Sequence, residues 1–258
     1  MIMKKQIIVA LLLLGMVCSV YAEPDYVKML KEVDELVTFK ESDLSAEYTI
    51  VKRDPDGSSS TTVAAMFRRD SEEKFVVLVL QPVADKGKGY LKQGNNLWLY
   101  DPIGKGFTFT SAKERFQNSS FRVSDFTGSN YAGNYDIKSV KQEKLGKFNC
   151  TVFDLEANTK SVSFPKVKIW VSDDNLVRKL EDYSLSGQLM RTSAFPSYQK
   201  VGKRWVPAKI IIQDHLVFRK VGDKTEYERT TVDIKNPSLN KQPDSLYTKE
   251  YLERVNTK

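Results

Sequence analysis

The chain has 258 residues, 41% of them hydrophobic, and a formal net charge of +7 from 40 Lys and Arg against 33 Asp and Glu. One histidine excludes zinc sites built from several histidines, and two cysteines are too few for a disulfide framework. The basic residues are spread along the chain rather than clustered among aromatic residues. This argues against nucleic acid as a partner and favours at most a weak attraction to anionic membrane surfaces.

Residues 1–22 have the pattern of an export signal peptide. Lys4 and Lys5 form a basic start, and the apolar run 7–17 that follows is too short to span a bilayer comfortably. The small side chains near Ala22 are of the kind that a signal peptidase reads. We therefore expect cleavage after Ala22.

Cleavage leaves residues 23–258, a length that suits one large all-β domain. Cys18 allows a second interpretation, a lipoprotein acylated at this cysteine, but the bulky Val17 before it fits that processing poorly. Once Cys18 is removed, Cys150 has no internal disulfide partner. We expect Cys150 to be a small buried residue of a strand.

The sequence carries no recognisable catalytic constellation. His215 is the only side chain that could act as the base of a Ser–His–Asp triad, and we expect it to be an ordinary strand or turn residue. There is no nucleophile elbow, no HExxH motif and no cluster of metal ligands. We therefore expect a protein that is not an enzyme and that uses no cofactor or metal ion.

The first element after the signal is predicted to be an amphipathic helix at residues 25–38. Pro24 suits a helix start, because its missing N–H would be unpaired there. The apolar residues recur at steps of three and four and so share one face, which we expect to pack on a sheet. These residues are Tyr26, Met29, Leu30, Val33, Leu36 and Val37.

From residue 45 onward the pattern changes to the period-two alternation of strands separated by turn residues. In the first turn Pro55 presets φ and Gly57 accepts a positive φ. We expect about ten to twelve antiparallel strands in sequential hairpins. The segments with strand pattern include 47–53, 61–69, 73–80, 97–100, 107–110, 147–155, 167–171, 188–195, 198–201, 204–206, 209–213, 216–221 and 225–234.

So many antiparallel strands must curl, split into two layers or close. The expected fold is mainly β: a curved antiparallel sheet that forms an incomplete β-barrel, covered by the N-terminal helix and by short helices. Residues 111–134 carry more polar and small residues than the rest. We expect this segment to be a flap that need not pack as core.

The hairpin at residues 96–110 displays aromatic side chains. Strand alternation sends Leu97 and Leu99 to one face and the aromatic residues to the other, without showing which face is concave. The aromatic residues are candidates for the lining of an apolar pocket, with plain core packing as the alternative for each. They are Trp98, Tyr100, Phe107 and Phe109.

Several short motifs follow one another along the chain. LWLYDP at 97–102 is followed by SDF at 124–126 and by KIWVSDDN at 168–175. WVPAK at 205–209 and LYTKEYL at 246–252 come later. By these motifs and their order, the chain resembles the outer-membrane lipoprotein-sorting proteins, the LolA/LolB-like family of periplasmic lipid-binding carriers.

The resemblance implies a hydrophobic cavity under a lid, in which acyl chains of lipoproteins or related lipids are held. It implies a periplasmic carrier that takes cargo from an inner-membrane exporter complex and passes it to an acceptor at the outer membrane. In that family an arginine on an early strand helps to hold the lid closed. Arg68 and Arg69 lie in about the right region, with solvated strand-end charges as the alternative. Leu30 and Val33 of the helix would then face the lipid.

A hypothesis of a different class is a surface-exposed adhesin or structural binding protein. It would bind through exposed loops, and the loops rich in Ser, Gly and Asn at 56–62 and 127–134 are candidates. Protease treatment of intact cells separates the two hypotheses, because an adhesin is cleaved and a periplasmic carrier is protected.

Overall fold

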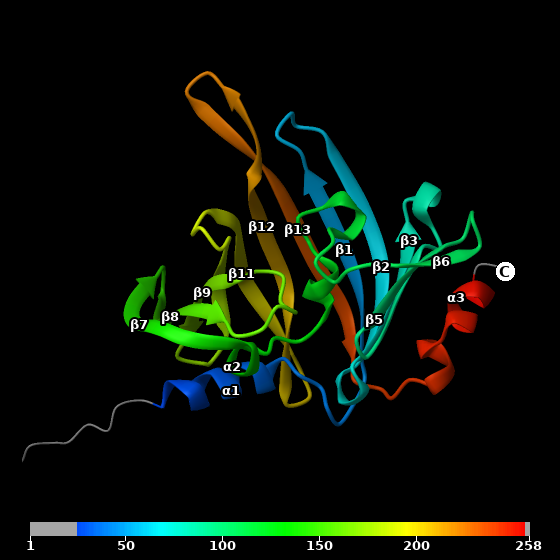
Figure 1. Cartoon of the computed structure of the whole chain (residues 1–258), viewed down its shortest axis with the longest axis horizontal. Coiled ribbons are helices and arrows are strands. Elements are labelled where there is room, and N and C mark those ends of the chain that lie inside the picture. Colours follow the sequence, from blue (N-terminus) through cyan, green and yellow to red (C-terminus); the bar gives the residue numbers. More distant parts are fainter. Residues whose placement is uncertain (1–24, 256–258) are drawn as a thin grey trace, which may run out of the picture.

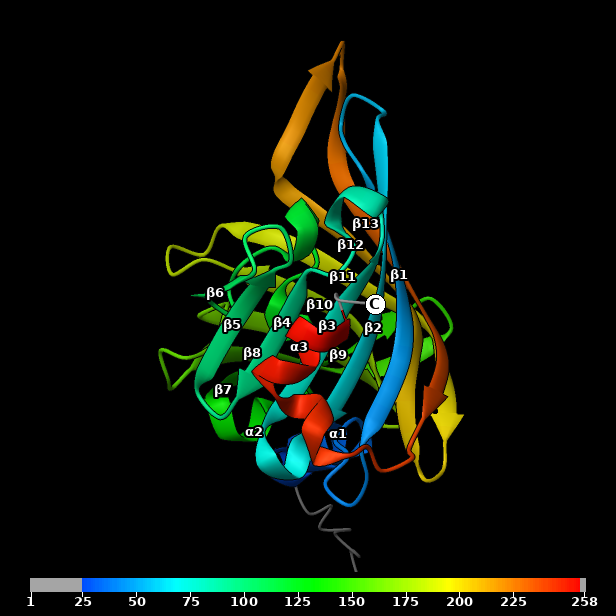
Figure 2. The same ribbon diagram turned by 90° about the vertical axis from the view of Figure 1, so that its right-hand side faces the viewer.

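The computed structural model describes residues 25–255, and the predicted export signal at residues 1–22 lies outside them. Within the described part, thirteen strands form one antiparallel sheet in the order β6-β5-β4-β3-β2-β1-β13-β12-β11-β10-β9-β8-β7. The sheet bends into an open bowl, and its two edge strands do not pair with each other (Figures 1 and 2). The predicted incomplete barrel is confirmed, with slightly more strands than expected.

The first half of the sheet follows the sequence in simple hairpins. Helix α1 precedes it, and the backbone N–H of Lys28 donates to the side chain of Asp25 at 2.9 Å at the helix start. Burial alternates along β1, so that every second side chain faces the interior of the bowl. The elements are α1 (Tyr26–Leu36), β1 (Leu44–Arg53), β2 (Ser59–Arg69), β3 (Lys74–Gln81), β4 (Gly89–Gln93), β5 (Asn96–Asp101) and β6 (Gly106–Phe109).

The second half begins at the opposite edge and returns to the centre, where β13 pairs with β1. Two of its strands are longer than expected, because bulges near Ala194 and after Asp214 join segments that the sequence divides into shorter strands. The elements are β7 (Tyr135–Leu145), β8 (Phe148–Ala157), β9 (Lys166–Ser172), β10 (Val177–Tyr183), β11 (Leu189–Val201), β12 (Arg204–Val221), β13 (Lys224–Ser238) and α3 (Lys249–Val255).

Residues 110–134, which we name the crossover segment, connect β6 to β7. These two strands lie at opposite ends of the sheet, so the connection has to cross one of its faces. It runs through the interior of the bowl (Figure 1). The segment holds the short helical turns η3 (Phe116–Asn118) and η4 (Val123–Phe126) and the one-turn helix α2 (Tyr131–Asn134).

The C-terminal helix α3 covers the convex face of the sheet over β3 to β5 (Figure 2). Leu252 is completely buried there, in a cluster with Val76, Leu91 and Tyr100. A Cβ atom at Gly89 would come within 2.5 Å of Leu252 Cδ2, so glycine in β4 lets the helix approach closely. In the part of the chain that the structure describes, no helix is both long and apolar enough to cross a bilayer.

We expect Leu252→Ala to lower the free energy of unfolding by about 3 kcal/mol, through lost apolar burial and the cavity left behind. Urea denaturation measures the loss. Val83→Ala is the control, because this valine is 88% exposed and its truncation should change stability by less than about 0.5 kcal/mol. Equal stability of the two variants would show that α3 is not docked on the sheet.

Candidate functional site

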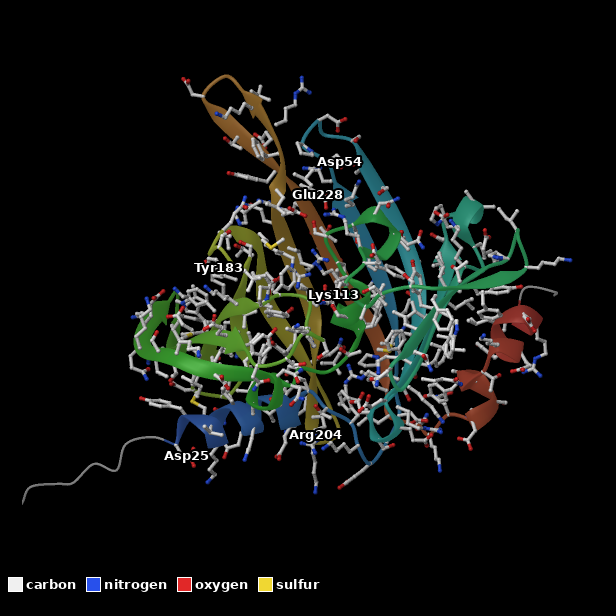
Figure 3. All side chains as sticks on the ribbon, in the orientation of Figure 1. Asp25, Asp54, Lys113, Tyr183, Arg204 and Glu228 are labelled. Atoms are coloured by element: carbon white, nitrogen blue, oxygen red, sulfur yellow. The ribbon has the colours of Figure 1, made fainter. Side chains whose placement is uncertain are left out.

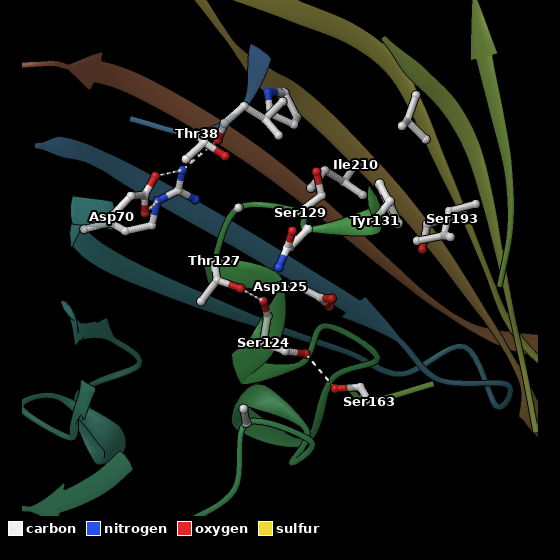
Figure 4. Close-up of a pocket in the computed structure, with 18 of the residues that line it drawn as sticks. Thr38, Asp70, Ser124, Asp125, Thr127, Ser129, Tyr131, Ser163, Ser193 and Ile210 are labelled. Atoms are coloured by element: carbon white, nitrogen blue, oxygen red, sulfur yellow. Dashed lines mark hydrogen bonds and ion pairs between the residues drawn. The ribbon is translucent and has the colours of Figure 1, made fainter. Parts of the chain in front are cut away.

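The bowl contains a cavity of about 690 Å³ between the concave face of the sheet, the end of α1 and the crossover segment (Figure 4). Its walls are contributed by both halves of the sheet, so it depends on the β1–β13 pairing. Ser193 and Ile210 project from the sheet wall, and Ser124, Asp125 and Thr127 come from the crossover segment. Among the apolar lining residues are Val33, Tyr48, Leu180, Phe195, Ile210 and Ile212.

Helix α1 closes one side of the cavity. Val33 contributes to the lining, whereas Leu30 packs with Phe153 and Ile169 in the apolar cluster behind it. The Asp34 carboxylate accepts hydrogen bonds from the backbone N–H groups of Tyr131 and Ala132, both at 2.9 Å. Burial raises the pKa of Asp34, and these backbone bonds lower it in part. Asp34 therefore ties α1 to α2.

The crossover segment fills the rest of the bowl with its own aromatic rings. Phe116, Phe121 and Phe126 are completely buried, although the sequence predicts a flap that need not pack as core. Phe126 lies 5.1 Å from the ring of Tyr48, measured between ring centroids. Phe116 lies 5.2 Å from the ring of Tyr90. The expectation of an unpacked flap was wrong, because the few apolar side chains of the segment pack against the concave face of the sheet.

Two ionic clusters fasten this segment to the second half of the sheet. In the first, Arg191 donates from Nη1 to Asp125 at 2.6 Å and from Nε to Asp182 at 2.6 Å. The same guanidinium donates to the backbone carbonyl of Ser120 at 3.1 Å. Asp182 is 1% exposed, and this burial raises the pKa of its carboxyl against the opposing effect of Arg191.

The second cluster lies nearer the start of the segment. Arg115 donates from Nη1 to Asp214 of β12 at 2.6 Å and from Nη2 to Glu228 of β13. The hydroxyl of Ser120 also donates to Glu228. The backbone N–H of Ser120 donates to Thr230 Oγ1 at 3.1 Å. The crossover segment is thus held by charge at two separate points.

Arg68 contacts both elements that cover the bowl. Its Nη2 donates to the backbone carbonyl of Val37 at 2.8 Å, and its Nη1 donates to that of Phe126 at 3.1 Å. Its Nε lies 2.7 Å from Asp70 Oδ1 in an ion pair (Figure 4 shows Asp70 and the neighbouring Thr38). The alternative of a solvated strand-end charge does not apply, because Arg68 is buried.

Arg69 points to the opposite face, as strand alternation requires. Its Nε donates to Asp43 at 2.9 Å, and its Nη1 donates to Asp244 at 2.5 Å. It also lies over the ring of Tyr247, at 4.8 Å from the centroid. The hypothesis that Arg69 holds a lid is therefore corrected: the residue holds the C-terminal segment against the sheet.

The four aromatic candidates of the hairpin at residues 96–110 do not line the cavity. Trp98, Tyr100 and Phe107 lie on the convex face in the cluster beneath α3, and Phe109 is 75% exposed on the edge strand. The concave side of β5 carries Leu97 and Leu99 instead. The assignment of these aromatic residues to the lining is corrected, because α3 uses the face on which they lie.

The remaining single residues behave largely as expected. Cys150 is 1% exposed within β8, which confirms a small buried strand residue. His215 lies in β12, its Nε2 is 2.9 Å from Thr192 Oγ1, and burial lowers its pKa. Of the two loops proposed for adhesion, 127–134 borders the cavity, where Thr127 and Ser129 are among the lining residues, and it stays partly exposed.

Asp125, Asp182 and Arg191 were not predicted as site residues from the sequence. One signal was available: Asp182 and Arg191 are direct partners in the β10–β11 register, and both occupy inward positions of the alternation. An opposite-charge pair on the inner face of neighbouring strands marks a buried ionic contact. Asp125 carried no such pattern, because it lies in irregular backbone.

Comparison with protein families gives one match for most of the chain. A family model described as "-like: Uncharacterized protein" matches residues 71–254. The chain belongs to this family. No curated protein sequence matches it.

Solved structures with the same fold extend this result. A LolA superfamily protein from Nitrosomonas europaea is 24% identical, with a TM-score of 0.72 over 87% of this chain and 97% of that one. A putative outer-membrane lipoprotein-sorting protein domain from Vibrio parahaemolyticus is 19% identical, with a TM-score of 0.76 over 88% and 98%. A DUF1329 family protein from Desulfovibrio piger is 16% identical, with a TM-score of 0.75 over 88% and 97%. The predicted resemblance to the LolA-like proteins is confirmed at the level of the fold.

We expect Asp43→Asn to lower the free energy of unfolding by about 3 kcal/mol near neutral pH, because Arg69 loses a buried partner. Burial alone would raise the pKa of Asp43, but the hydrogen bonds from Arg69 and from the Gln242 N–H hold it below the ordinary value. The stabilisation is therefore complete above the unfolded pKa of about 3.9 and is lost as the pH falls through the lower folded pKa.

Urea denaturation at several pH values between 7 and 3 measures this difference between wild type and variant. Asp223→Asn is the matched control, because Asp223 is an exposed turn residue. A wild-type advantage that does not shrink at the acidic end would contradict the assignment.

Proposed function

We propose that this protein is a non-enzymatic periplasmic carrier that holds acyl chains of lipoproteins or related lipids and shuttles them from the inner to the outer membrane. Its donor would be an inner-membrane exporter complex, and its receiver an acceptor at the outer membrane. The observation that carries the proposal is the partly open, mainly apolar cavity of about 690 Å³ between the sheet, α1 and the crossover segment.

The size and chemistry of the cavity support this assignment. Ligand pockets commonly have volumes of about 300–1,000 Å³. Each buried methylene contributes roughly 0.8 kcal/mol, so about ten methylenes would give some 8 kcal/mol, an upper bound that corresponds to micromolar affinity. Affinity in this range suits a carrier, which has to retain its cargo in water and still release it.

The cover of the cavity also suits a carrier. The crossover segment is attached to the sheet by hydrogen bonds, ion pairs and apolar contacts. All of these contacts are non-covalent, so the segment can leave the sheet and return. Arg68 donates to the carbonyl of Val37, directly after α1, and to that of Phe126, the last residue of η4. It is therefore the candidate for holding this lid closed. Displacement of Phe116, Phe121 and Phe126 would free further apolar surface for a longer chain.

The structural relatives support the location. One is described as a putative outer-membrane lipoprotein-sorting protein domain and another as a LolA superfamily protein. The segment at residues 1–22 supports export in the same way. Of the two loops that the adhesin hypothesis would use, 127–134 contributes Thr127 and Ser129 to the lining of the cavity.

Native mass spectrometry and lipid extraction of the exported protein test the proposal, followed by titration with a fluorescent fatty acid and with a synthetic triacyl lipopeptide. Ser193 is 2% exposed and lines the cavity, so Ser193→Phe should narrow it at this wall and weaken probe binding about tenfold or more. Ser60→Phe, at an exposed position of β2, is the matched control. A protein that carries no lipid and ignores both probes would overturn the carrier function.

The lid is tested separately with Asp125→Asn, which removes one carboxylate from Arg191. Losing a charged hydrogen bond costs about 1.5–3 kcal/mol, so amide exchange over residues 116–126 should speed up roughly tenfold or more. Hydrogen–deuterium exchange with mass spectrometry measures it. Glu114→Gln changes an exposed carboxyl in the same segment, and equal exchange in both variants would mean that Asp125 does not hold the segment.

A further inference from the structure

The β12–β13 hairpin extends beyond the rest of the sheet as a two-stranded ribbon (Figures 1 and 2). On one side the β11–β12 pairing ends at Asp214, and on the other the β1–β13 pairing ends at Arg229. Beyond these points β12 and β13 pair only with each other. We name residues 215–227 the hairpin tip. Isolated two-stranded ribbons are marginally stable in water, so a long projecting one needs a reason other than support of the fold.

The hairpin tip exposes large apolar side chains that contact no core. Leu216 is 45% exposed, Phe218 52% and Val221 53%. The ring of Tyr227 lies 6.0 Å from that of Phe218 and extends this apolar surface. Single exposed apolar residues are normal on proteins, but a group of them on one projecting element marks an interaction surface.

The charges of the hairpin tip are mixed, with a small positive excess. Its exposed charged residues are three basic ones, Arg219, Lys220 and Lys224, and two acidic ones, Asp223 and Glu226. Long Lys and Arg side chains can keep their charge in a polar layer while their methylene stems lie against apolar groups. Exposed apolar side chains with interleaved basic residues are complementary to a membrane interface, where headgroups lie above acyl chains.

We propose that the hairpin tip rests on its side in the interface of a lipid bilayer that carries anionic headgroups. Phe218 and Tyr227 are direct partners in the β12–β13 register and would face the acyl boundary, with Leu216 beside them. Asp223 and Lys224 at the turn would stay at the headgroup level, because the contact is lateral. The proposal does not rest on the carrier function, because it concerns a surface outside the cavity.

The base of the hairpin gives this contact a structural consequence. Asp214 and Glu228, at its base, are the two carboxylates that bind Arg115 of the crossover segment (Figure 3 labels Glu228). The membrane-facing ribbon and the fastening of the cavity cover therefore share the same strands. The strands that would contact the bilayer at the tip therefore also carry, at their base, the two carboxylates that bind Arg115.

Vesicle flotation of the full exported protein tests the proposal, with vesicles of phosphatidylethanolamine and phosphatidylglycerol compared with phosphatidylcholine. Leu216→Asp with Phe218→Asp should reduce the vesicle-bound fraction about tenfold or more. Val83→Asp with Leu185→Asp is the matched control, because these residues are 88% and 74% exposed at other sites and should bind within about twofold of wild type. Lys220→Glu with Lys224→Glu should weaken binding to the anionic vesicles only.

Three results would overturn the membrane proposal: no flotation of the wild type, equal flotation of the tip and control variants, or loss of a dimer in light scattering by the tip variants alone. The last result would identify the tip as a contact between copies of the chain. Fatty-acid titration of the tip variants keeps the two proposals apart. Unchanged probe binding with lost flotation supports the membrane contact, whatever the outcome of the carrier test.

Discussion

The pairing of β1 with β13 is the constraint on which the rest of the structure depends. It places Tyr48 beside Ile234 and Ile50 beside Val232 at the centre of the sheet, and so joins the two halves. As a result β6 and β7, which are consecutive in sequence, become the two far edges. Their connection must cross a face, and it takes the concave one, where its phenylalanines find apolar surface. The cavity is the part of that face which the crossing leaves uncovered.

An irregular segment inside a bowl creates a difficulty, because buried backbone groups need hydrogen-bond partners. Two arginines supply such partners here. Arg68 donates to the carbonyl of Phe126 and Arg191 to that of Ser120. Each of these arginines also forms an ion pair, so a single side chain satisfies the backbone and balances a carboxylate.

Period and turn chemistry were enough to predict the helix and the hairpins, because those features are local. The open barrel was predicted from the number of antiparallel strands and from the resemblance to the LolA-like proteins. The face occupied by Trp98 and Tyr100 was not predictable, since it depends on where α3 docks after the whole sheet is complete. The burial of the crossover segment was also out of reach. Its apolar residues at 116, 121, 123 and 126 follow neither a helical nor a strand period, so a local reading gives a loop.

The buried charges in the bowl need an explanation beyond stability. Well-packed apolar residues hold a permanent core at least as firmly as a buried ion pair does, because the charges lose their hydration. Ion pairs have a different advantage: they fix one register, and each charged group regains water when the segment leaves. The two clusters hold the crossover segment near Arg115 and near Asp125, with the aromatic rings between them. The contact between the crossover segment and the sheet thus resembles a protein–protein interface, with an apolar centre and ion pairs at its ends. That arrangement suits a site where a segment of the chain and an apolar ligand compete for the same surface.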